Sequence, residues 1–376
     1  MKTEQMGAVV QDRHAQIQDV HVSAYSIPTD RPESDGTLEW DQTTMVLVRI
    51  AAGGQTGLGY TYAHAAAGRL IHDTLAPAVR EMNVFDIPAC WHAMTTLVRN
   101  DGESGLSRMA ISAVDGALWD LKAKLLDVSL VRLLGAARDE VPAYGSGGFT
   151  SYTIEQLKNQ LGGWADKGFS MVKMKIGRRP KDDPRRIEAA REAIGDEASL
   201  FVDANGGYAC KQALAMADRF PEWGVSWYEE PVNHLDLGGL RLLRQRAPAG
   251  VEVTAGEYGF NIEYFRRMVQ AGAVDVLQAD ATRCGITGFL QAAALCEAHH
   301  LPMSSHCAPS LHLPVCCAAS PIRHMEYFHD HVRIEHMLFD GAATAEKGML
   351  RPDLSRPGLG LDFKEQDARS YEIPYG

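Results

Sequence analysis

From Val141 onward, short apolar runs of strand length alternate with segments of helical pattern. This alternation is typical of βαβ units and a parallel sheet. Eight such units in roughly 190 residues fit a closed (β/α)8 barrel, on the short side for that architecture. The predicted strands are Val141–Tyr144, Met171–Lys175, Ser199–Asp203, Val225–Glu229, Val251–Glu257, Val274–Asp280, Pro302–His306 and Arg323–Tyr327.

The residues before the barrel follow a different pattern. The alternating runs Asp19–Tyr25 and Thr44–Ile50 predict two strands of an antiparallel hairpin. Pro28–Asp41 contains chain-breaking Pro, Asp and Gly and is predicted to be a long connecting loop. A helix is predicted over Leu106–Leu126, where apolar residues fall four apart. These apolar residues are Met109, Ala113, Ala117, Leu121 and Leu125.

Composition excludes several classes of protein. The chain has 376 residues, of which 45% are hydrophobic and 23% charged, as in soluble globular proteins. Its formal net charge of −11 argues against binding to nucleic acid, which requires a basic face. No run approaches the roughly 18 apolar residues that span a membrane, and the first residues lack the apolar segment of a secretory signal. We therefore expect a cytoplasmic protein that binds neither nucleic acid nor membranes.

The seven cysteines form no recognisable motif. Their number is odd and no CxxC spacing occurs, so neither a disulfide framework nor a thiolate zinc site is predicted. Cys307 is predicted to be a small buried hydrophobic residue.

Seven consecutive predicted strands end in an ionisable residue, although their interiors are apolar. In a barrel, the carboxyl ends of the strands meet at one mouth, where the active sites of this architecture lie. We therefore expect these side chains to converge. They are Lys173 and Lys175, Asp203, Glu229, Glu257, Asp280, His306 and Glu326.

Three successive strands supply carboxylates, namely Asp203, Glu229 and Glu257. Such hard oxygen ligands suit Mg²⁺, and no softer ligand at these positions favours zinc. Glu230 follows Glu229 and, by strand alternation, is predicted to point to the other face. Asn205 is predicted to face the same way as Asp203, where its amide could reach a substrate or a lysine.

Two groups at the strand ends are predicted to act as bases. Lys173 and Lys175 share one face, and repulsion between their ammonium groups is expected to lower their pKa. Asp280 and His306 end adjacent strands. A carboxylate bound to one imidazole nitrogen fixes the tautomer and makes the other nitrogen more basic.

In this order, these residues resemble those of the mandelate racemase subgroup of the enolase superfamily. The resemblance covers nearly the whole chain. Each motif alone is weak, but the complete set of motifs in this order is specific. The matching segments are KMKIG at Lys173–Gly177, DAN at Asp203–Asn205, EEP at Glu229–Pro231, GE at Gly256–Glu257, QAD at Gln278–Asp280, SSH at Ser304–His306, HMEY around Glu326, and AISAVDGALWDLKAK at Ala110–Lys124.

The resemblance implies an α/β fold with two domains. A modified TIM barrel of the (β/α)7β type would occupy residues 141–341. An N-terminal α+β capping domain would occupy residues 1–140 and be completed by the C-terminal tail, residues 342–376. The resemblance also implies a homo-oligomer that acts on a small-molecule carboxylate.

The same resemblance implies roles for the residues at the barrel mouth. Mg²⁺ would bind the three carboxylates named above. Lys175 would act as one base and the His306–Asp280 pair as the other, while Glu326 would hydrogen-bond a carboxylate oxygen of the substrate. The segment Asp280–Gly285 contains no lysine, which excludes muconate-cycloisomerase-like and dipeptide-epimerase-like members.

Removal of a proton next to a carboxylate requires stabilisation of the enolate, which Mg²⁺ supplies together with a donor such as protonated Glu326 or Lys173. A β-hydroxyl could then leave as water and give a 2-keto-3-deoxy acid. We therefore expect a hydro-lyase that dehydrates an aldonate or aldarate. The alternatives are a racemase or epimerase of a 2-hydroxy acid, and a non-catalytic barrel that binds a ligand.

Substrate specificity is expected to lie in two capping-domain segments, Thr29–Thr43 and Tyr60–His64. As lids, these segments would exclude water from the closed site. The candidates for contact with the distal end of the substrate are Arg31, Trp40, Tyr62 and His64.

Overall fold

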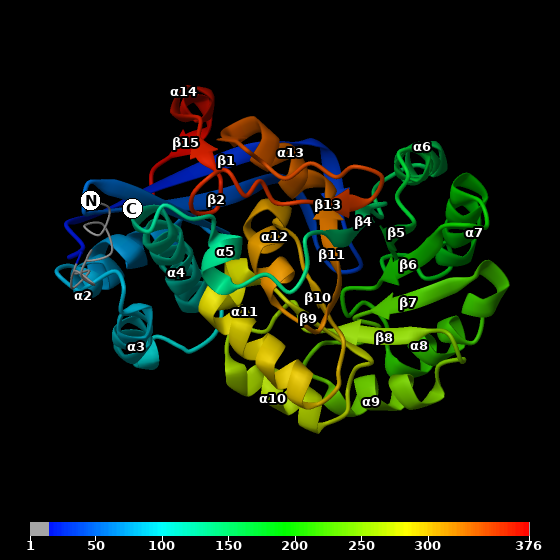
Figure 1. Cartoon of the computed structure of the whole chain (residues 1–376). Coiled ribbons are helices and arrows are strands. Elements are labelled where there is room, and N and C mark those ends of the chain that lie inside the picture. Colours follow the sequence, from blue (N-terminus) through cyan, green and yellow to red (C-terminus); the bar gives the residue numbers. More distant parts are fainter. Residues whose placement is uncertain (1–14, 376) are drawn as a thin grey trace, which may run out of the picture.

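The eight strands predicted after residue 140 all form, and they close into one parallel barrel (Figure 1). The computed structural model describes residues 15–375, and within this range each barrel strand pairs with the next until β11 pairs with β4. The predicted fold class is confirmed. The strands are β4 (Val141–Gly147), β5 (Met171–Lys175), β6 (Ser199–Asp203), β7 (Val225–Glu229), β8 (Glu252–Ala255), β9 (Val276–Ala279), β10 (Met303–Ser305) and β11 (Ile322–Phe328).

A helix follows each barrel strand in the sequence and covers the outside of the barrel (Figure 1). The first of these helices begins with a capping box, in which Thr153 and Gln156 satisfy each other's backbone N–H groups. The helices are α6 (Ile154–Asp166), α7 (Asp183–Ile194), α8 (Cys210–Ala217), α9 (Leu237–Arg246), α10 (Ile262–Gln270), α11 (Ala281–Ala298), α12 (Pro309–Ala318) and α13 (His329–Leu338).

Aromatic rings fill the barrel below its mouth. Phe201 and Trp227 stack with their ring centroids 5.1 Å apart, and Tyr144 packs edge-on against Phe201 at 5.5 Å. Because side chains alternate along a strand, Asp203 and Glu229 share the face of these rings, two residues nearer the strand ends. The alternation of side chains along β6 and β7 therefore places the two carboxylates next to the apolar interior of the barrel.

The residues before the barrel form an antiparallel sheet in the order β15-β1-β2-β3. Its strands are β1 (Asp19–Ser34), β2 (Glu39–Ala52), β3 (Gln55–Tyr62) and, from the C-terminus, β15 (Glu372–Ile373). The predicted helix is present as α4 (Leu106–Leu125) and packs closely on β3. Gly59 permits this approach, since a Cβ there would lie 2.3 Å from backbone atoms of α4. The shorter helices are α1 (Ala66–Leu70), α2 (Ala76–Val79), α3 (Ile87–Leu97) and α5 (Leu130–Leu134).

The prediction of a long loop at Pro28–Asp41 is wrong. β1 continues to Ser34 and β2 begins at Glu39, with a register shift between Pro28 and Glu33. An irregular register tolerates proline, which cannot donate a ladder hydrogen bond. The tight turn is closed by Asp35, whose Oδ1 accepts hydrogen bonds from the backbone N–H groups of residues 37 and 38 at 2.6 and 2.7 Å. The chain-breaking residues thus mark a bulge and a turn within a long hairpin.

The C-terminal tail contacts both parts of the chain. β13 (Met349–Leu350) pairs with β4 of the barrel, whereas β15 pairs with β1 of the N-terminal sheet. Figure 1 shows α14 (Glu365–Ala368) and β15, in red, near β1. Between them in the sequence, β14 (Asp362–Phe363) pairs with β12 (Phe339–Asp340). The division into residues 1–140 with 342–376 and residues 141–341 stays a prediction.

The tip of the β1–β2 hairpin rests on the barrel mouth. A Cβ on Gly36 would lie 2.1 Å from the carbonyl oxygen of Ala204 and 2.9 Å from that of Ile176. We expect Gly36→Ala to lift the tip, at a cost of about 1–3 kcal/mol, because these backbone oxygens cannot move aside cheaply. Limited proteolysis should then cleave within residues 35–38 about tenfold faster than in the wild type.

Gly163→Ala in α6 is the matched control, since nothing lies within 4 Å of a Cβ at that position. It should leave the cleavage rate unchanged. If Gly36→Ala were cleaved no faster than this control, the hairpin tip would not be held by its contact with the barrel.

Candidate active site

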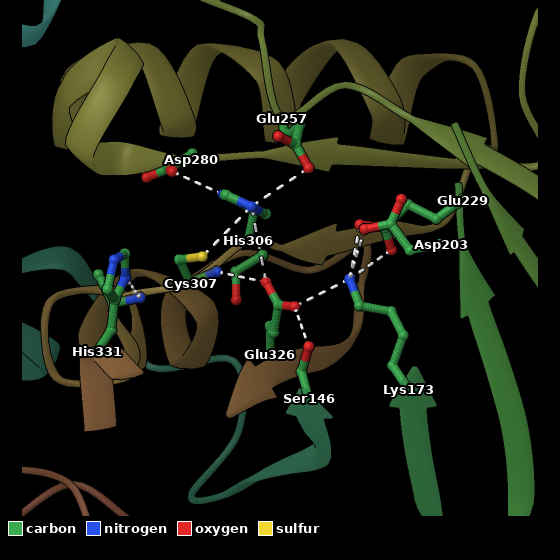
Figure 2. Close-up of polar contacts among 12 residues, drawn as sticks. Ser146, Lys173, Asp203, Glu229, Glu257, Asp280, His306, Cys307, Glu326 and His331 are labelled. Carbon is green, nitrogen blue, oxygen red and sulfur yellow. Dashed lines mark hydrogen bonds and ion pairs between the residues drawn. The ribbon is translucent and has the colours of Figure 1, made fainter. Parts of the chain in front are cut away.

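Three carboxylates from successive strand ends form one buried cluster at the barrel mouth (Figure 2). Asp203 ends β6, Glu229 ends β7, and Glu257 follows β8. One oxygen of each lies within 4.8 Å of the others, and all three residues are buried. Anionic oxygens this close repel one another unless cations lie among them.

The donors in this cluster fit a hard divalent cation. All three are carboxylates, and within residues 15–375 the buried Oε2 of Glu257 makes no hydrogen bond and has only an ion-pair contact of 3.2 Å with His306 Nε2. A buried carboxylate oxygen without a hydrogen bond is costly, and binding an ion would offset that cost. Mg²⁺ prefers such oxygen ligands, and three of them leave coordination positions open for a substrate.

Two lysines of β5 point into the cluster. Lys173 Nζ donates to both carboxylate oxygens of Glu229, at 2.6 and 2.7 Å, and lies 2.9 Å from Glu326 Oε1. Lys175 Nζ donates to Asp203 Oδ2 at 2.5 Å. The expected lowering of the lysine pKa is wrong in this structure. Burial alone would lower the pKa of each lysine, but the carboxylates outweigh burial and raise both above the usual range.

Asp280 and His306 form a buried pair across adjacent strands. His306 Nδ1 lies 2.8 Å from Asp280 Oδ2, and Asp280 Oδ1 accepts from the backbone N and the Oγ1 of Thr282, both at 2.7 Å. Burial alone would lower the pKa of His306, but Glu257 and the bond to Asp280 outweigh burial and raise it. With Nδ1 bonded to Asp280, Nε2 points at the cluster, 3.2 Å from Glu257 Oε2.

Glu326 connects the lysine side of the site to the histidine side. Its Oε1 accepts from Ser146 Oγ at 2.5 Å, and its Oε2 accepts from the backbone N of Cys307 at 2.7 Å. Burial alone would raise the pKa of Glu326, but the positive charges of Lys173 and His306 outweigh it and hold the pKa well below its usual range. This pKa shift favours the ionised carboxylate and runs against the expectation of a protonated Glu326 as donor, whereas the expectation of Lys173 as donor stays a prediction.

The chain turns sharply after two of the strand ends. Glu230 has φ +37° and Asn205 has φ +44°, so strand alternation does not extend to either residue. Burial, followed by the charge of Glu257, raises the pKa of Glu230 well above its usual range. The strand alternation on which the predicted orientation of Glu230 rests therefore does not apply at this residue. The Oδ1 of Asn205 is buried, and within the described residues it pairs with no lysine.

Two of the four specificity candidates lie near the site. The ring of Tyr62 stacks on His331 with a centroid separation of 3.5 Å, and its hydroxyl is buried. Trp40 donates Nε1–H to Glu33 Oε2 at 2.9 Å and packs against a small apolar cluster that includes Cys307. Both residues come from the sheet that covers the barrel mouth.

The other two candidates, Arg31 and His64, are exposed. His64 Nδ1 accepts from the backbone N of Ala66 at 3.2 Å, at the start of α1. Within residues 15–375, no hydrogen bond or ion pair joins either side chain to the carboxylate cluster. Their role in specificity stays a prediction.

Three further polar residues contact the site and were not predicted to do so. Ser146 bonds to Glu326, Cys307 Sγ lies 3.3 Å from His306 Nε2, and His312 Nε2 lies 3.5 Å from Asp280 Oδ1. Ser146 lies near the end of the first barrel strand, so the strand-end rule extended to hydroxyl groups would have found it. His312 lies inside α12, where the sequence gives no such signal.

Two family models cover most of the chain. The model described as "Mandelate racemase / muconate lactonizing enzyme, N-terminal domain" matches residues 20–135, and the model described as "Enolase C-terminal domain-like" matches residues 156–368. The chain therefore belongs to the mandelate racemase/muconate lactonizing enzyme family of the enolase superfamily. The resemblance found in the sequence is confirmed.

Known proteins are similar over nearly the whole length. L-talarate/galactarate dehydratase of Salmonella typhimurium is 31% identical over 363 residues, which cover 93% of this chain and 89% of that protein. A mandelate racemase/muconate lactonizing enzyme-like protein from Rubrobacter xylanophilus is 51% identical, with a TM-score of 0.93 and coverage of 95% and 100%. A racemase from Streptomyces coelicolor, solved with bound magnesium, is 28% identical, with a TM-score of 0.89 and the same coverage. Other similar proteins are named cycloisomerases.

These findings define an enzyme of the enolase superfamily. The Mg²⁺ prediction is confirmed on two grounds, because similar structures hold magnesium and this chain has a buried acidic cluster that could hold the ion. Among the helices of residues 15–375, none has the length and apolar content needed to cross a membrane.

Glu257→Gln tests the donor set, because it removes one negative charge without changing the shape of the side chain. We expect the affinity for Mg²⁺, measured by calorimetric titration, to fall about 10- to 100-fold. Glu252→Gln on the same strand is the control, since Glu252 pairs with Arg323 away from the cluster. An unaltered titration of Glu257→Gln would remove Glu257 from the ligand set.

Proposed function

We propose that the protein removes the proton next to the carboxylate of a sugar acid and then expels the β-hydroxyl as water, which gives a 2-keto-3-deoxy acid. The arrangement of two bases carries this proposal. Lys175 contacts the carboxylate cluster at Asp203, and His306 Nε2 contacts it at Glu257. An acid held at the cluster would thus have one base at each side.

Asp203, Glu229 and Glu257 would hold the Mg²⁺ ion. When bound, the ion stabilises the negative charge that develops on the carboxylate oxygens as the α-proton leaves. Lys173 is buried beneath the cluster and can donate a hydrogen bond to the same oxygens, which adds to this stabilisation.

One base takes the α-proton and the other, in its protonated form, delivers a proton to the departing hydroxyl. Asp280 holds the Nδ1–H of His306, so the proton is exchanged at Nε2. Lys175 exchanges its proton at Nζ. The α-proton goes to one base, and the water that leaves carries the β-hydroxyl and a proton from the other base.

Polar atoms without partners support a ligand rich in hydroxyl groups. Within residues 15–375, the hydroxyl of Tyr62, the Oδ1 of Asn205 and the Oε1 of Glu33 are buried and make no hydrogen bond. Buried polar groups normally have partners, and substrate hydroxyls would supply them. A dehydratase of L-talarate and galactarate, which are sugar acids, is among the similar proteins.

Racemisation of a 2-hydroxy acid is the second candidate. Phe149, Tyr152 and Phe328 form an apolar cluster with Cys307, which lies next to His306. Such an apolar cluster favours an acid with an apolar substituent and no leaving group at the β-carbon. The same two bases would then exchange protons on opposite faces, and a racemase is among the similar structures.

Lys175→Ala and His306→Ala should each lower turnover by about 10²- to 10⁴-fold, because each removes a base or acid from the reaction. Both variants should keep the fold and bind Mg²⁺, as checked by circular dichroism and calorimetry. Lys158→Ala is the control, because Lys158 forms an exposed ion pair with Glu192 on the barrel's outside. Full turnover in either test variant would contradict the role assigned to that residue.

Proton NMR on a library of four- to six-carbon sugar acids, with enzyme and Mg²⁺ in D₂O, names the reaction. A 2-keto-3-deoxy product would establish dehydration and identify the substrate. Deuterium uptake at the α-carbon without loss of water would instead point to a racemase, or to an acid that binds but carries the wrong stereochemistry at its β-hydroxyl. If no acid of either kind reacted or exchanged, the proposed function would be wrong.

A further inference from the structure

A second group of ligand atoms lies beside the carboxylate cluster and differs from it in chemistry. Cys307 Sγ lies 3.3 Å from His306 Nε2, and Glu326 Oε2 lies 3.9 Å from the same nitrogen. The three ligand atoms all lie within 4.8 Å of one another, and the three residues are buried. Figure 2 shows the sulfur of Cys307 and the carboxylate of Glu326 both joined by dashed lines to the imidazole of His306.

We propose that His306, Cys307 and Glu326 form a second metal site, which takes Zn²⁺ or another thiophilic divalent ion and blocks catalysis when it is filled. The inference deepens the proposed function, on which its regulatory meaning rests. The three donors are an imidazole, a thiol and a carboxylate. Zinc readily takes this mixture, whereas magnesium selects oxygen ligands alone.

The spacing of the donors agrees with tetrahedral zinc. Zn–N bonds of about 2.0 Å and Zn–S bonds of about 2.3 Å place the nitrogen and sulfur about 3.5 Å apart in a tetrahedron. The separation of 3.3 Å between His306 Nε2 and Cys307 Sγ is close to that value. Two ligands at about 2.0 Å from the metal lie about 3.3 Å apart in a tetrahedron, so Glu326 Oε2, at 3.9 Å from the nitrogen, would have to move closer by about 0.6 Å.

The surroundings hold two of the three donors in place, as the outer contacts of metal ligands do. The other nitrogen of His306, Nδ1, bonds to Asp280, which orients the ring and directs the Nε2 lone pair at the site. Glu326 is held by Ser146 and by the backbone N of Cys307 itself. Zinc ligands commonly have such hydrogen-bonded carboxylates behind them.

Glu257 connects this group of ligand atoms to the carboxylate cluster. Its Oε2 is buried and forms an ion-pair contact of 3.2 Å with His306 Nε2. Because Glu257 also belongs to the carboxylate cluster, the two sites adjoin.

Zinc at this site would inhibit proton transfer directly. Cys307 would bind as the thiolate, so the thiol loses its S–H proton to solvent as the S–Zn bond forms. The His306 lone pair that accepts the substrate proton would be occupied by the metal. The holoenzyme would then retain Mg²⁺ at its carboxylates and yet be inactive.

Cobalt titration tests the site without any substrate. Mg²⁺-saturated enzyme is titrated with Co²⁺, and a thiolate-to-cobalt charge-transfer band is expected to grow to one equivalent and to disappear when Zn²⁺ is added. Cys307→Ser should abolish the band and weaken Zn²⁺ binding about 10- to 100-fold. Cys296→Ser, at a buried cysteine of α11, is the matched control and should keep both.

Absence of the band in the wild type, or its persistence in Cys307→Ser, would overturn the proposal. If Cys307→Ser fails to fold, X-ray absorption at the zinc edge of the wild-type holoenzyme decides instead. One sulfur at about 2.3 Å supports the site, and a shell of nitrogen and oxygen alone contradicts it. Neither readout uses turnover. If a sulfur ligand is found but no sugar acid reacts, only the proposed function is overturned. If a sugar acid reacts but no sulfur ligand is found, only the zinc site is overturned.

Discussion

Buried negative charge at the barrel mouth is the constraint on which the rest of the site depends. Six carboxyl groups are buried there, from Asp203, Glu229, Glu230, Glu257, Asp280 and Glu326. The basic groups among them are Lys173, Lys175, His306 and Arg283. Burial and the charge of Asp203 raise the pKa of Glu229 to about 7, which indicates that the lysines only partly offset the repulsion. A divalent cation would complete the neutralisation, since buried charges are tolerated when they are paired.

Thr282 connects the N-terminal sheet and α4 to this charged centre. Thr282 holds Asp280 by its backbone N and its hydroxyl, and its carbonyl oxygen accepts from Thr61 Oγ1 at 2.6 Å and from Ser112 Oγ. Asp280 in turn orients His306. A chain of hydrogen bonds therefore runs from β3 and α4 through Thr282 and Asp280 to His306.

The sequence predicted those parts of the site that depend on strand period alone. The apolar interiors and charged ends of strands such as β6 and β7 placed Asp203 and Glu229 correctly at one mouth, because alternation and barrel closure leave no other arrangement. The errors arose where contacts between distant segments of the chain determine the structure or the pKa. The loop at Pro28–Asp41 became strand because β1 and β2 pair with each other. The pKa of Lys173 rose because carboxylates from other strands surround it.

The central claim is that the two bases act separately on one acid held at the carboxylate cluster. The direct test is exchange of the α-proton with D₂O, followed by NMR in Lys175→Ala, in His306→Ala and in the double variant, with the acid that the wild type converts. The account predicts that product formation falls about 10²- to 10⁴-fold in each single variant, that at least one still exchanges the α-proton, and that the double variant exchanges none. Exchange at the wild-type rate in the double variant would show that another group removes the proton and would contradict the account.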